Sequence, residues 1–357
     1  MNAADSSHFK TLSFEDSEFN SYLRGTFSKD LLALPVSTLN VRTQTEEVTF
    51  EVVSKNKVRK PGWFYILLKL LRPQTLSFSV GTMLVSYIVG TRLKLELDPK
   101  FSFLTIFAVL FFHAAINLLN DYYDHMKGHD RVNPRGGSRV IQLAWIRAYL
   151  VQAYGFGFLA LSIAFGIPVL FLHSKIVMTL AALSALAGLE FSTHKLGLKN
   201  LGLGEYLVFF LTGPFLTCGF VWAISGHFQP EMIYLGCLFG FVTLFFYHAS
   251  NIESIFADAQ AGRKTWAVFV GIDRAKKILW LIAALIASSY FAFAINFDRA
   301  NLMIYTLMFF IIATHISLIC IKSSRTRSPL SGELESIRAR SLRLHWLTVS
   351  CLIIATI

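Results

Sequence analysis

Charged residues are scarce in this chain. Only 15% of its 357 residues are Asp, Glu, Lys or Arg, whereas 54% are hydrophobic and 14% are aromatic, and the mean hydropathy is +0.53. A typical soluble domain contains about 25% charged residues. The composition therefore excludes an ordinary soluble protein and indicates a protein with several membrane-spanning helices.

Cysteine is also scarce, and its placement argues against a metal site. The four cysteines lie inside apolar segments, without a C-x-x-C spacing and without a histidine at the spacing of metal ligands. We expect them to pack as small hydrophobic residues. The first 60 or so residues lack the apolar core of a secretory signal, so we expect a cytosolic N-terminus. The cysteines are Cys218, Cys237, Cys320 and Cys351.

Long apolar runs follow one another through most of the chain. A helix needs about 20 apolar residues to cross a bilayer, and nine runs approach or exceed that length, which predicts an all-α, polytopic membrane protein with about nine transmembrane helices. The runs are Phe64–Val89, Phe101–Leu119, Ala144–Phe171, Ile176–Phe191, Leu203–Ile224, Met232–Ala249, Ile278–Ile295, Leu302–Ile321 and Leu342–Ile357.

The net charge of +11 reflects membrane topology rather than binding to nucleic acid, because Lys and Arg lie between apolar runs and not along one solvated face. If the runs alternate across the bilayer, 25 Lys and Arg residues fall on one side and five on the other. Positive loops are retained in the cytosol. The sequence therefore predicts that the N-terminus and the loops after the second and sixth runs are cytosolic.

Residues 1–62 form a polar N-terminal extension with a serine-rich, mixed-charge start. Val48, Phe50 and Val52 alternate with polar residues, which could mark a short strand. We favour a flexible cytosolic tail, since so short a segment buries little core.

Two acidic stretches lie where a long apolar run meets polar chain: NDYYDHMKGHD, which begins at Asn120, and NIESIFADAQAGRKT, which begins at Asn251. On a helix, Asn117, Asn120, Asp121 and Asp124 share one face, and Asn251, Ser254 and Asp258 repeat this layout.

Carboxylates at the ends of membrane helices are costly unless they have a function. Mg²⁺ is usually held by one or two carboxylates together with substrate phosphate oxygens. The two stretches therefore favour a diphosphate site with bound Mg²⁺. The alternative is that they are solvated caps and turns beyond helix ends. Cations that could assist the diphosphate are Lys127, Arg131, Arg139, Arg263 and Lys264.

The chain resembles the UbiA superfamily of membrane prenyltransferases, and within it the branch that prenylates 1,4-dihydroxy-2-naphthoate in menaquinone synthesis. Four pieces carry the resemblance, which spans about Gly62 to Ile357, so we expect a prenyltransferase domain at residues 63–357. The pieces are LLRPQTLSFSVGTMLVSYIVG, NLLNDYYDHMKGHD, KLGLKNLGLGEYLVFFLTGPFLTCG and NIESIFADAQAGRKTWAVFVG.

The resemblance implies helices around a central cavity, with both acidic motifs at its cytosolic mouth, in a membrane that we expect to be bacterial and cytoplasmic. Asn120, Asp124, Asp130 and Asp258 would hold Mg²⁺, and Asp121 would accompany Asn120 in catalysis. The expected substrates are a polyprenyl diphosphate and an aromatic acceptor. Candidate substrate-binding residues are Arg72, Lys127, Arg139, Lys195, Glu205, Asn251 and Lys264.

The second motif departs from the family pattern. Ser254 stands where the family has an Asp, and Glu253 stands where the branch often has an Arg. A hydroxyl is a weaker Mg²⁺ ligand than a carboxylate. Glu253 lies about 100° further round a helix, so it could replace the lost charge only if the helix end unwinds.

Several supporting residues have two interpretations. Lys195, Lys199 and Arg72 could bind the diphosphate or could be cytosolic anchors. Glu205 begins an apolar run, where it could position the acceptor hydroxyl or only favour the helix dipole. Three further side chains could touch the acceptor, although buried core histidines are common. These are His113, Tyr247 and His248.

The sequence thus predicts Mg²⁺-dependent transfer of a polyprenyl group to 1,4-dihydroxy-2-naphthoate. Another aromatic acceptor, such as 4-hydroxybenzoate, and a non-catalytic member that binds prenyl lipid or quinone are the alternatives. A transporter is disfavoured because the acids gather at one face rather than at the bilayer midplane, and because no internal repeat is apparent.

Overall fold

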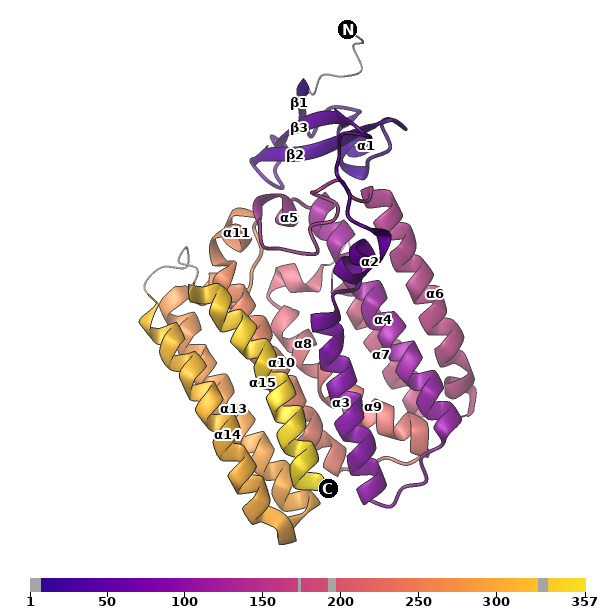
Figure 1. Ribbon diagram of the computed structural model, residues 1–357, viewed down its shortest axis with the longest axis vertical. Helices are drawn as coiled ribbons and strands as arrows, with labels where there is room; N and C mark the ends of the chain where they lie inside the picture. Colours follow the sequence, from indigo (N-terminus) through magenta and orange to yellow (C-terminus); the bar gives the residue numbers. More distant parts are fainter. Residues whose placement is uncertain (1–7, 173–174, 192–196, 327–332) are drawn as a thin grey trace.

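Long helices fill the chain from Trp63 onward, and most run between the same two ends of the molecule (Figure 1). The computed structural model describes residues 8–172, 175–191, 197–326 and 333–357. The long helices are α3 (Pro73–Arg92), α4 (Pro99–Met126), α6 (Ala148–Leu172), α7 (Lys175–Glu190), α10 (Glu231–Glu253), α13 (Ile272–Phe297), α14 (Leu302–Arg325) and α15 (Glu333–Thr356).

Shorter helices connect or precede the long ones. They are α2 (Trp63–Leu71), α5 (His129–Val132), η2 (Leu198–Leu201), α8 (Gly204–Thr212), α9 (Pro214–Ser225), α11 (Ile255–Gln260), α12 (Trp266–Val270) and η3 (Arg299–Asn301).

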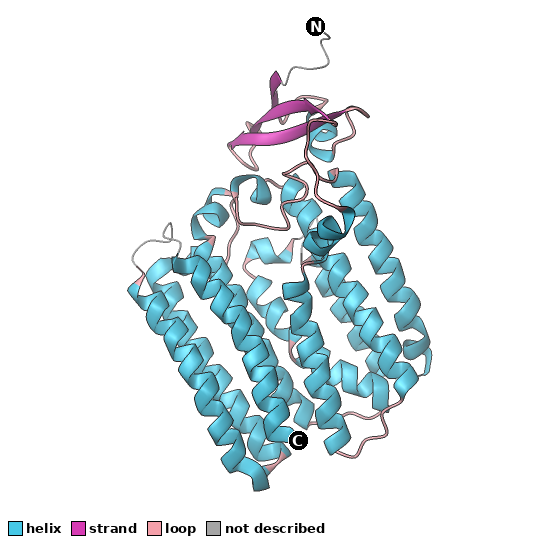
Figure 2. Cartoon of the chain, in the orientation of Figure 1, coloured by secondary structure: helices cyan, strands magenta, loops and turns pink. Residues whose placement is uncertain are grey.

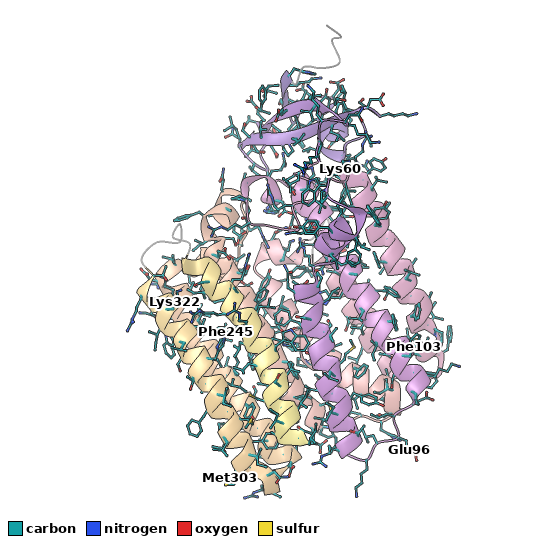
Figure 3. The ribbon with its side chains drawn as sticks, viewed as in Figure 1. Lys60, Glu96, Phe103, Phe245, Met303 and Lys322 are labelled. Atoms are coloured by element: carbon teal, nitrogen blue, oxygen red, sulfur yellow. The ribbon has the colours of Figure 1, made fainter. Side chains whose placement is uncertain are left out.

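Six spans among the described residues are long and apolar enough to cross a membrane, so the predicted number of nine is not confirmed. Phe103, on the outer surface of α4, is 54% exposed, as expected for a lipid-facing side chain (Figure 3). The spans are Pro99–Met126, Ala148–Phe171, Gly204–Ser225, Glu231–Glu253, Ile272–Phe297 and Arg299–Arg325.

Helices α4 and α10 continue past the apolar runs that predict them. The run behind α4 ends at Leu119, but the helix continues to Met126; α10 likewise passes Ala249 and ends at Glu253. The start of α4 is fixed by Asp98, whose carboxylate accepts hydrogen bonds from the backbone N–H groups of Lys100 and Phe101. Both helices therefore carry their polar motifs on a final helical turn or two.

The first predicted helix is broken in two. Arg72 lies between α2 and α3 in the left-handed region, with φ of 51°, and Pro73 follows it. Proline disfavours the α conformation in the residue before it, which explains the position of the break. The break carries Arg72 into the interior of the bundle.

Helix α10 is the centre of the bundle, with 67% of its most apolar window buried. It packs against α3, α8, α9, α13 and α15. The chain between α8 and α9 approaches it closely: a Cβ on Gly213 would lie 2.6 Å from the Cα of Gly240. Such close contact between helices requires small residues.

A small sheet covers one end of the bundle (Figure 2). Strands β1 (His8–Ser13), β2 (Leu31–Leu39) and β3 (Glu47–Ser54) form an antiparallel sheet in the order β1-β3-β2, with a bulge at Pro35–Ser37 and the short helix α1 (Phe19–Arg24) beside it.

The side chains that predict the short strand, Val48, Phe50 and Val52, lie in β3 and are at most 1% exposed. They pack with Leu12, Phe19 and Leu23 in a separate core. The short strand is therefore confirmed and the preference for a flexible tail is wrong for residues 8–54, whereas the predicted helical membrane fold is confirmed by the helices from Trp63 onward.

The three strands, α1 and their connecting loops (residues 8–54) are called the sheet domain below. Specific polar contacts join this domain to the bundle. Glu46 Oε1 accepts from Arg131 Nη2 at 2.6 Å, and both side chains are almost fully buried. Arg42 Nη1 lies 3.3 Å from the carbonyl oxygen of Ala261, and His125 Nε2 is 3.0 Å from that of Leu23. The sheet thus contacts both acidic stretches.

Candidate active site

A cavity of about 950 Å³ lies inside the bundle. Its walls come from α3, α4, α6, α7, α8, α9, α10 and α15. Along most of its length the lining is apolar, with side chains such as Phe78, Phe112, Ile163, Phe215 and Phe246. At the end beneath the sheet domain the lining becomes densely charged, so the cavity has one polar and one apolar part.

The first acidic motif provides part of the polar end. Asn117, Asn120 and Asp124 all line the cavity from α4, as a shared helical face predicts. Asp130, on α5, lines it as well. The structure therefore brings three of the four predicted metal ligands, Asn120, Asp124 and Asp130, to one end of the cavity.

Lys199 reaches this cluster from η2. Its Nζ lies 2.8 Å from Asp124 Oδ2 and 2.7 Å from Oδ1, and it also donates a hydrogen bond to Asn120 Oδ1. The side chain is 1% exposed, and burial lowers its pKa to about 8 although Asp124 opposes this effect. Lys199 is therefore a buried counter-ion of the first motif.

Asp121 is not among the described residues that line the cavity, and it holds two other groups. Its carboxylate pairs with Arg72 Nη2 and accepts a hydrogen bond from the backbone N–H of Ser138 at 3.2 Å. Arg72 itself lines the cavity, and its Nε has no hydrogen-bond partner in the described structure. Asp121 thus orients a cation toward the cavity.

The loop after α5 wraps closely around Asp130. A Cβ on Gly136 would lie 2.6 Å from Asp130 Oδ1, and one on Gly137, where φ is 62°, would meet both Asp130 and Asp121. Arg139 Nη1 donates to the backbone carbonyls of Asp130 and Asn133. Burial, and next Asp124, raise the pKa of Asp130 to about 7.

The second motif is arranged differently from the first. The break between α10 and α11 falls at Ser254, whose hydroxyl donates to Asp258 Oδ2 at 2.7 Å. Arg263 Nη1 is 3.1 Å from Asp258 Oδ1. Asp258 is not among the described residues that line the cavity, whereas Ser254 and Arg263 are. The layout predicted to match the first motif is therefore not repeated.

Arg263 connects the two motifs electrostatically. Burial lowers its pKa, but Asp258, Asp124, Tyr247 and Asp130 together outweigh burial, so the pKa of the guanidinium is raised overall. A cation that senses carboxylates from both motifs and lines the cavity is placed to meet an anionic group there.

Glu253 is paired with two arginines. Its Oε1 lies 3.1 Å from Arg135 Nη1 and its Oε2 lies 3.2 Å from Arg338 Nε, while its side chain is only 2% exposed. All three residues line the cavity. The doubtful metal ligand Glu253 is therefore already occupied by cations.

Glu205 does not face the cavity as expected. It is fully buried, and its Oε1 accepts hydrogen bonds at 2.9 Å from both Asn251 Nδ2 and the backbone N–H of Trp266. It is absent from the described cavity lining, which includes Asn251. Glu205 thus ties α8 to α10 and α12, and the interpretation that it faces the cavity to position an acceptor is wrong.

The other predicted cations lie outside the described lining. Lys264 is exposed, Lys127 is half-buried with its ammonium 6.0 Å from the ring centre of Tyr123, and Arg139 binds loop carbonyls as above. Lys195 falls outside the residues that the structure describes.

Among the aromatic candidates, His113 and Tyr247 line the cavity. His248 is not among the described lining residues, and its Nε2 lies 2.9 Å from the carbonyl oxygen of Ala275. His113 Nδ1 is 2.8 Å from Ser79 Oγ. The Tyr247 hydroxyl is buried and has no hydrogen-bond partner among the described residues.

The oxygen donors of the first motif fit a Mg²⁺ ion bound together with phosphate oxygens. Within the described residues, no group of three or more His, Cys, Asp or Glu side chains could hold a metal by itself. Asp124 Oδ1 is buried and makes no hydrogen bond of good geometry, and Asn120 and Asp130 line the same end. Asp258 is not placed with these three residues, because it does not line the described cavity and its oxygens contact Ser254 and Arg263.

The geometry adds functional candidates that the sequence left open or did not single out. The sequence did indicate a diphosphate-binding role for Lys199, because it is a lysine in a short loop within a family motif. The same argument applied to Lys195, so the sequence could not distinguish the two. Arg135 and Arg338 gave no distinguishing signal, since they lie far from Glu253 in sequence and meet it only in the fold.

The helices and their cavity define an integral membrane protein with an internal chamber that is charged at one end and apolar along the rest. Residues 79–331, which are most of the chain, match the UbiA prenyltransferase family. The chain belongs to this family and is a membrane-bound prenyltransferase.

Curated relatives include UbiA prenyltransferase domain-containing protein 1 of Dictyostelium discoideum, 22% identical over 270 residues that cover 73% of this chain and 80% of that protein. The 1,4-dihydroxy-2-naphthoate octaprenyltransferase of Haemophilus influenzae is 27% identical over 241 residues, 63% of this chain and 75% of that protein. The match to the human UbiA prenyltransferase domain-containing protein 1, at 26% identity, covers 56% of this chain and 60% of that protein.

Solved structures share the fold. A UbiA homologue from Archaeoglobus fulgidus bound to DMAPP and Mg²⁺ has a TM-score of 0.55 and 17% identity, covering 80% of this chain and 99% of that one. The apo structure of a UbiA homologue from Aeropyrum pernix K1 has a TM-score of 0.61 and 16% identity, covering 79% and 99%.

Proposed function

We propose that this protein transfers a polyprenyl group from a prenyl diphosphate to an aromatic acceptor, with 1,4-dihydroxy-2-naphthoate as the acceptor. The observation that carries the proposal is the two-part cavity, in which clustered carboxylates and cations border a long apolar chamber. A prenyl diphosphate has the same division, a charged head on an apolar chain. The A. fulgidus homologue bound to DMAPP and Mg²⁺ supports this choice of donor.

Residues of the first motif would hold the metal and the head group. Asn120, Asp124 and Asp130 would bind Mg²⁺, which supplies Lewis-acid stabilisation of negative charge on the leaving diphosphate when bound. Lys199, Arg72 and Arg263 would contact the diphosphate oxygens directly, because each lines the polar end of the cavity.

The reaction would begin with cleavage of the bond between the allylic carbon and the diphosphate oxygen, which leaves with the bonding electrons. The ring carbon of the acceptor that bears the carboxylate then forms a bond with the allylic carbocation. Loss of CO₂ from that carbon returns an electron pair to the ring and restores its aromaticity. The aromatic side chains of the chamber, such as Phe78 and Phe246, can stabilise the cation and keep water away from it.

The choice of acceptor rests on the H. influenzae relative, a 1,4-dihydroxy-2-naphthoate octaprenyltransferase, and on the sequence pieces that resemble that branch. Menaquinone synthesis is the corresponding pathway. His113 and Tyr247 are the polar aromatic side chains that we assign to the acceptor, since both line the cavity.

We also propose that the polar end of the cavity faces the cytosol of a bacterial cell. The 25-to-5 distribution of Lys and Arg supports this orientation. Lys60 and Lys322 lie toward the end that carries the sheet domain, and Glu96 and Met303 lie at the opposite end (Figure 3).

A non-catalytic role in binding prenyl lipid or quinone is a second candidate. It is favoured by Asp258, whose carboxylate is occupied by Ser254 and Arg263 and does not line the cavity. In that case the chain would bind a prenyl diphosphate without releasing pyrophosphate.

One assay tests the proposal. The purified full-length protein is incubated with a radiolabelled prenyl diphosphate and, in parallel, with 1,4-dihydroxy-2-naphthoate, with 4-hydroxybenzoate or without acceptor, each with Mg²⁺ or with EDTA. We expect prenylated naphthoquinol and pyrophosphate only with Mg²⁺ and the naphthoate. Transfer to 4-hydroxybenzoate alone would show that 4-hydroxybenzoate, and not the naphthoate, is the acceptor. Binding of the prenyl diphosphate without pyrophosphate release would favour the non-catalytic role.

A further inference from the structure

The loop between β2 and β3, residues 40–46, contacts both acidic stretches of the chain, and we call it the hairpin loop. It reaches α5, which contains the end of the first stretch, and the turn at residues 261–264, which follows α11 in the second stretch. The short helices α5 and α11 pack against each other below the sheet (Figure 1). The loop lies outside residues 79–331, the part of the chain that matches the family.

The hairpin loop packs directly on the end of the first motif. Glu46 Oε1 accepts a hydrogen bond from Arg131 Nη2 at 2.6 Å, and Arg131 Nε donates to the carbonyl oxygen of His125 at 3.0 Å. A Cβ on Gly128, where φ is 85°, would lie 2.5 Å from Val41 Cγ1. The loop therefore holds the segment that separates two of the proposed metal ligands.

The same loop also holds the turn of the second motif. Arg42 Nη1 lies 3.3 Å from the carbonyl oxygen of Ala261. Arg263, two residues further on, lines the cavity. On its other side the turn is fixed by the backbone N–H of Lys264, which donates to the carbonyl oxygen of Asn200 at 3.2 Å. The turn that carries Arg263 is thus held between the sheet domain and η2.

Glu46 connects the two contacts. Its Oε1 holds Arg131, and its Oε2 accepts a hydrogen bond at 2.8 Å from the backbone N–H of Arg42. Glu46 is 5% exposed. Arg42 has φ of 64°, which is uncommon for residues other than glycine and is kept only where surrounding contacts impose it. One buried carboxylate therefore fixes α5 and also the backbone that carries the Arg42 side chain.

Neither motif segment can hold its position by itself. Helix α5 has four residues and α11 has six, and helices this short are unstable without packing partners. Accurate placement matters, because Asp130 on α5 and Arg263 after α11 both line the cavity, and a misplacement of about 1 Å can slow a reaction roughly a hundredfold. Arg42 is not among the described lining residues, so it acts on the cavity through the turn rather than by contact.

We propose that the hairpin loop is a brace that fixes the two motifs relative to each other, with Glu46 and Arg42 as positioning residues for the groups that contact the diphosphate. Glu46 acts on the first motif through Arg131, and Arg42 acts on Arg263 through the turn at residues 261–264. The inference rests on the proposed function for the identity of the anion.

The first test is calorimetric binding of inorganic pyrophosphate with Mg²⁺ to the purified full-length protein. Arg42→Ala should weaken binding by roughly threefold to tenfold, up to the loss of one charge-assisted contact. Arg42→Lys can still donate to the carbonyl oxygen and should retain most of the affinity. If Arg42 acts through Arg263, Arg42→Ala should have no further effect in an Arg263→Gln background. Unchanged affinity in Arg42→Ala, or an equal fold-loss in both backgrounds, would overturn the proposal.

The second test is hydrogen exchange of backbone amides without any ligand. Arg42→Ala should speed exchange by roughly threefold or more in the peptide that covers residues 261–264, because the turn loses one of its two holds. Glu46→Gln should speed exchange there and at residues 125–132. Thermal unfolding of Arg42→Ala should hardly change, since Arg42 is exposed. The control is Arg24→Ala, because Arg24 is an exposed arginine of the sheet domain that contacts Gln152 of α6.

The exchange measurement separates this inference from the proposed function. If the original protein does not bind pyrophosphate, the assignment of the diphosphate fails, and the exchange rates alone decide whether the hairpin loop is a brace. Equal exchange at residues 261–264 in Arg42→Ala and Arg24→Ala would overturn the brace even if the protein transfers a prenyl group. Faster exchange in Arg42→Ala alone would support it.

Discussion

The ammonium of Lys199 lies 2.8 Å from Asp124 Oδ2 and also donates to Asn120 Oδ1, so one cation from η2 occupies two of the oxygen groups expected to bind Mg²⁺. Both side chains of the ion pair are almost fully buried. A buried carboxylate without a counter-ion is strongly unfavourable. Lys199 therefore neutralises Asp124 when no divalent cation is bound.

Lys199→Ala should leave Asp124 as an uncompensated buried charge. We expect a loss of about 3 kcal/mol in the free energy of unfolding, typical for a broken buried pair. Millimolar Mg²⁺ should restore more of the thermal stability in this variant than it adds to the original protein, because the ion replaces the lost charge. Thermal unfolding of detergent-solubilised protein, with Mg²⁺ or EDTA, measures both effects.

Lys264→Ala is the matched control for Lys199→Ala, because Lys264 is an exposed lysine near the same end of the bundle. It should unfold like the original protein in either buffer. Equal Mg²⁺ stabilisation in all three proteins would contradict the assignment of Mg²⁺ to Asp124.

The two acidic motifs should respond differently to loss of one carboxylate. Asp124→Asn removes a proposed ligand from the cavity, so the rate of transfer at saturating substrates should fall by at least about a hundredfold. Asp258→Asn acts through Arg263, which lines the cavity, and should chiefly raise the KM for the prenyl diphosphate. Initial rates across a range of Mg²⁺ and donor concentrations distinguish the two patterns.

Arg263→Gln is the companion variant in that experiment. If Asp258 acts only by orienting Arg263, the double variant should be no worse than Arg263→Gln alone. Full activity of both Asp124→Asn and Asp258→Asn would contradict the metal and diphosphate assignments together.

The arrangement of the first motif could be predicted because its residues follow one another on a single helix. Asn117, Asn120 and Asp124 recur at helical spacing, and α4 continues through them. The second motif was harder, because Ser254 marks a break between helices and the carboxylate of Asp258 turns to Arg263. Helical spacing predicts which residues share a face of a helix, but it does not predict which neighbouring side chain each of them contacts.

Partners from distant segments could not be predicted from one sequence. The pairing of Glu253 with Arg338 joins α10 to α15, and nothing local to either residue indicates it. The sheet domain gave only a partial signal: β3 shows alternation at Val48 and Phe50, whereas β2 reads LLALPVSTL, without regular alternation. A three-stranded sheet is hard to predict when only one of its strands shows a regular alternation.

The ion pair between Glu46 and Arg131 should hold the sheet domain on the bundle. Glu46→Gln leaves Arg131 buried without its carboxylate, so we expect a loss of about 3 kcal/mol in stability. The sheet domain should also become more sensitive to protease. Limited proteolysis and thermal unfolding report the two effects, and the exposed neighbour Glu47, changed to Gln, serves as the control. Identical digestion of Glu46→Gln and Glu47→Gln would show that the pair does not fasten the domain.

Glu205 should be a structural residue. Glu205→Ala removes the acceptor of hydrogen bonds from Asn251 and from the backbone of Trp266, which should cost about 1–3 kcal/mol of stability. Glu205→Gln keeps a carbonyl oxygen in place and should restore most of that loss. The acceptor KM of Glu205→Gln should be unchanged, because the side chain lies off the cavity. A raised acceptor KM with normal stability would restore a role in acceptor binding.

The Tyr247 hydroxyl should contact a substrate rather than the protein. It is buried at the cavity wall, has no partner among the described residues, and a Cβ on Gly204 would lie 2.9 Å from it. A buried hydroxyl without a partner costs free energy, so Tyr247→Phe should match or slightly exceed the stability of the original protein. If the hydroxyl binds the acceptor, the acceptor KM should rise by roughly fivefold to tenfold, the loss of about one hydrogen bond, while the KM for the prenyl diphosphate stays constant. Steady-state kinetics with each substrate varied in turn measure this difference, and an increase confined to the prenyl diphosphate would instead assign Tyr247 to the donor.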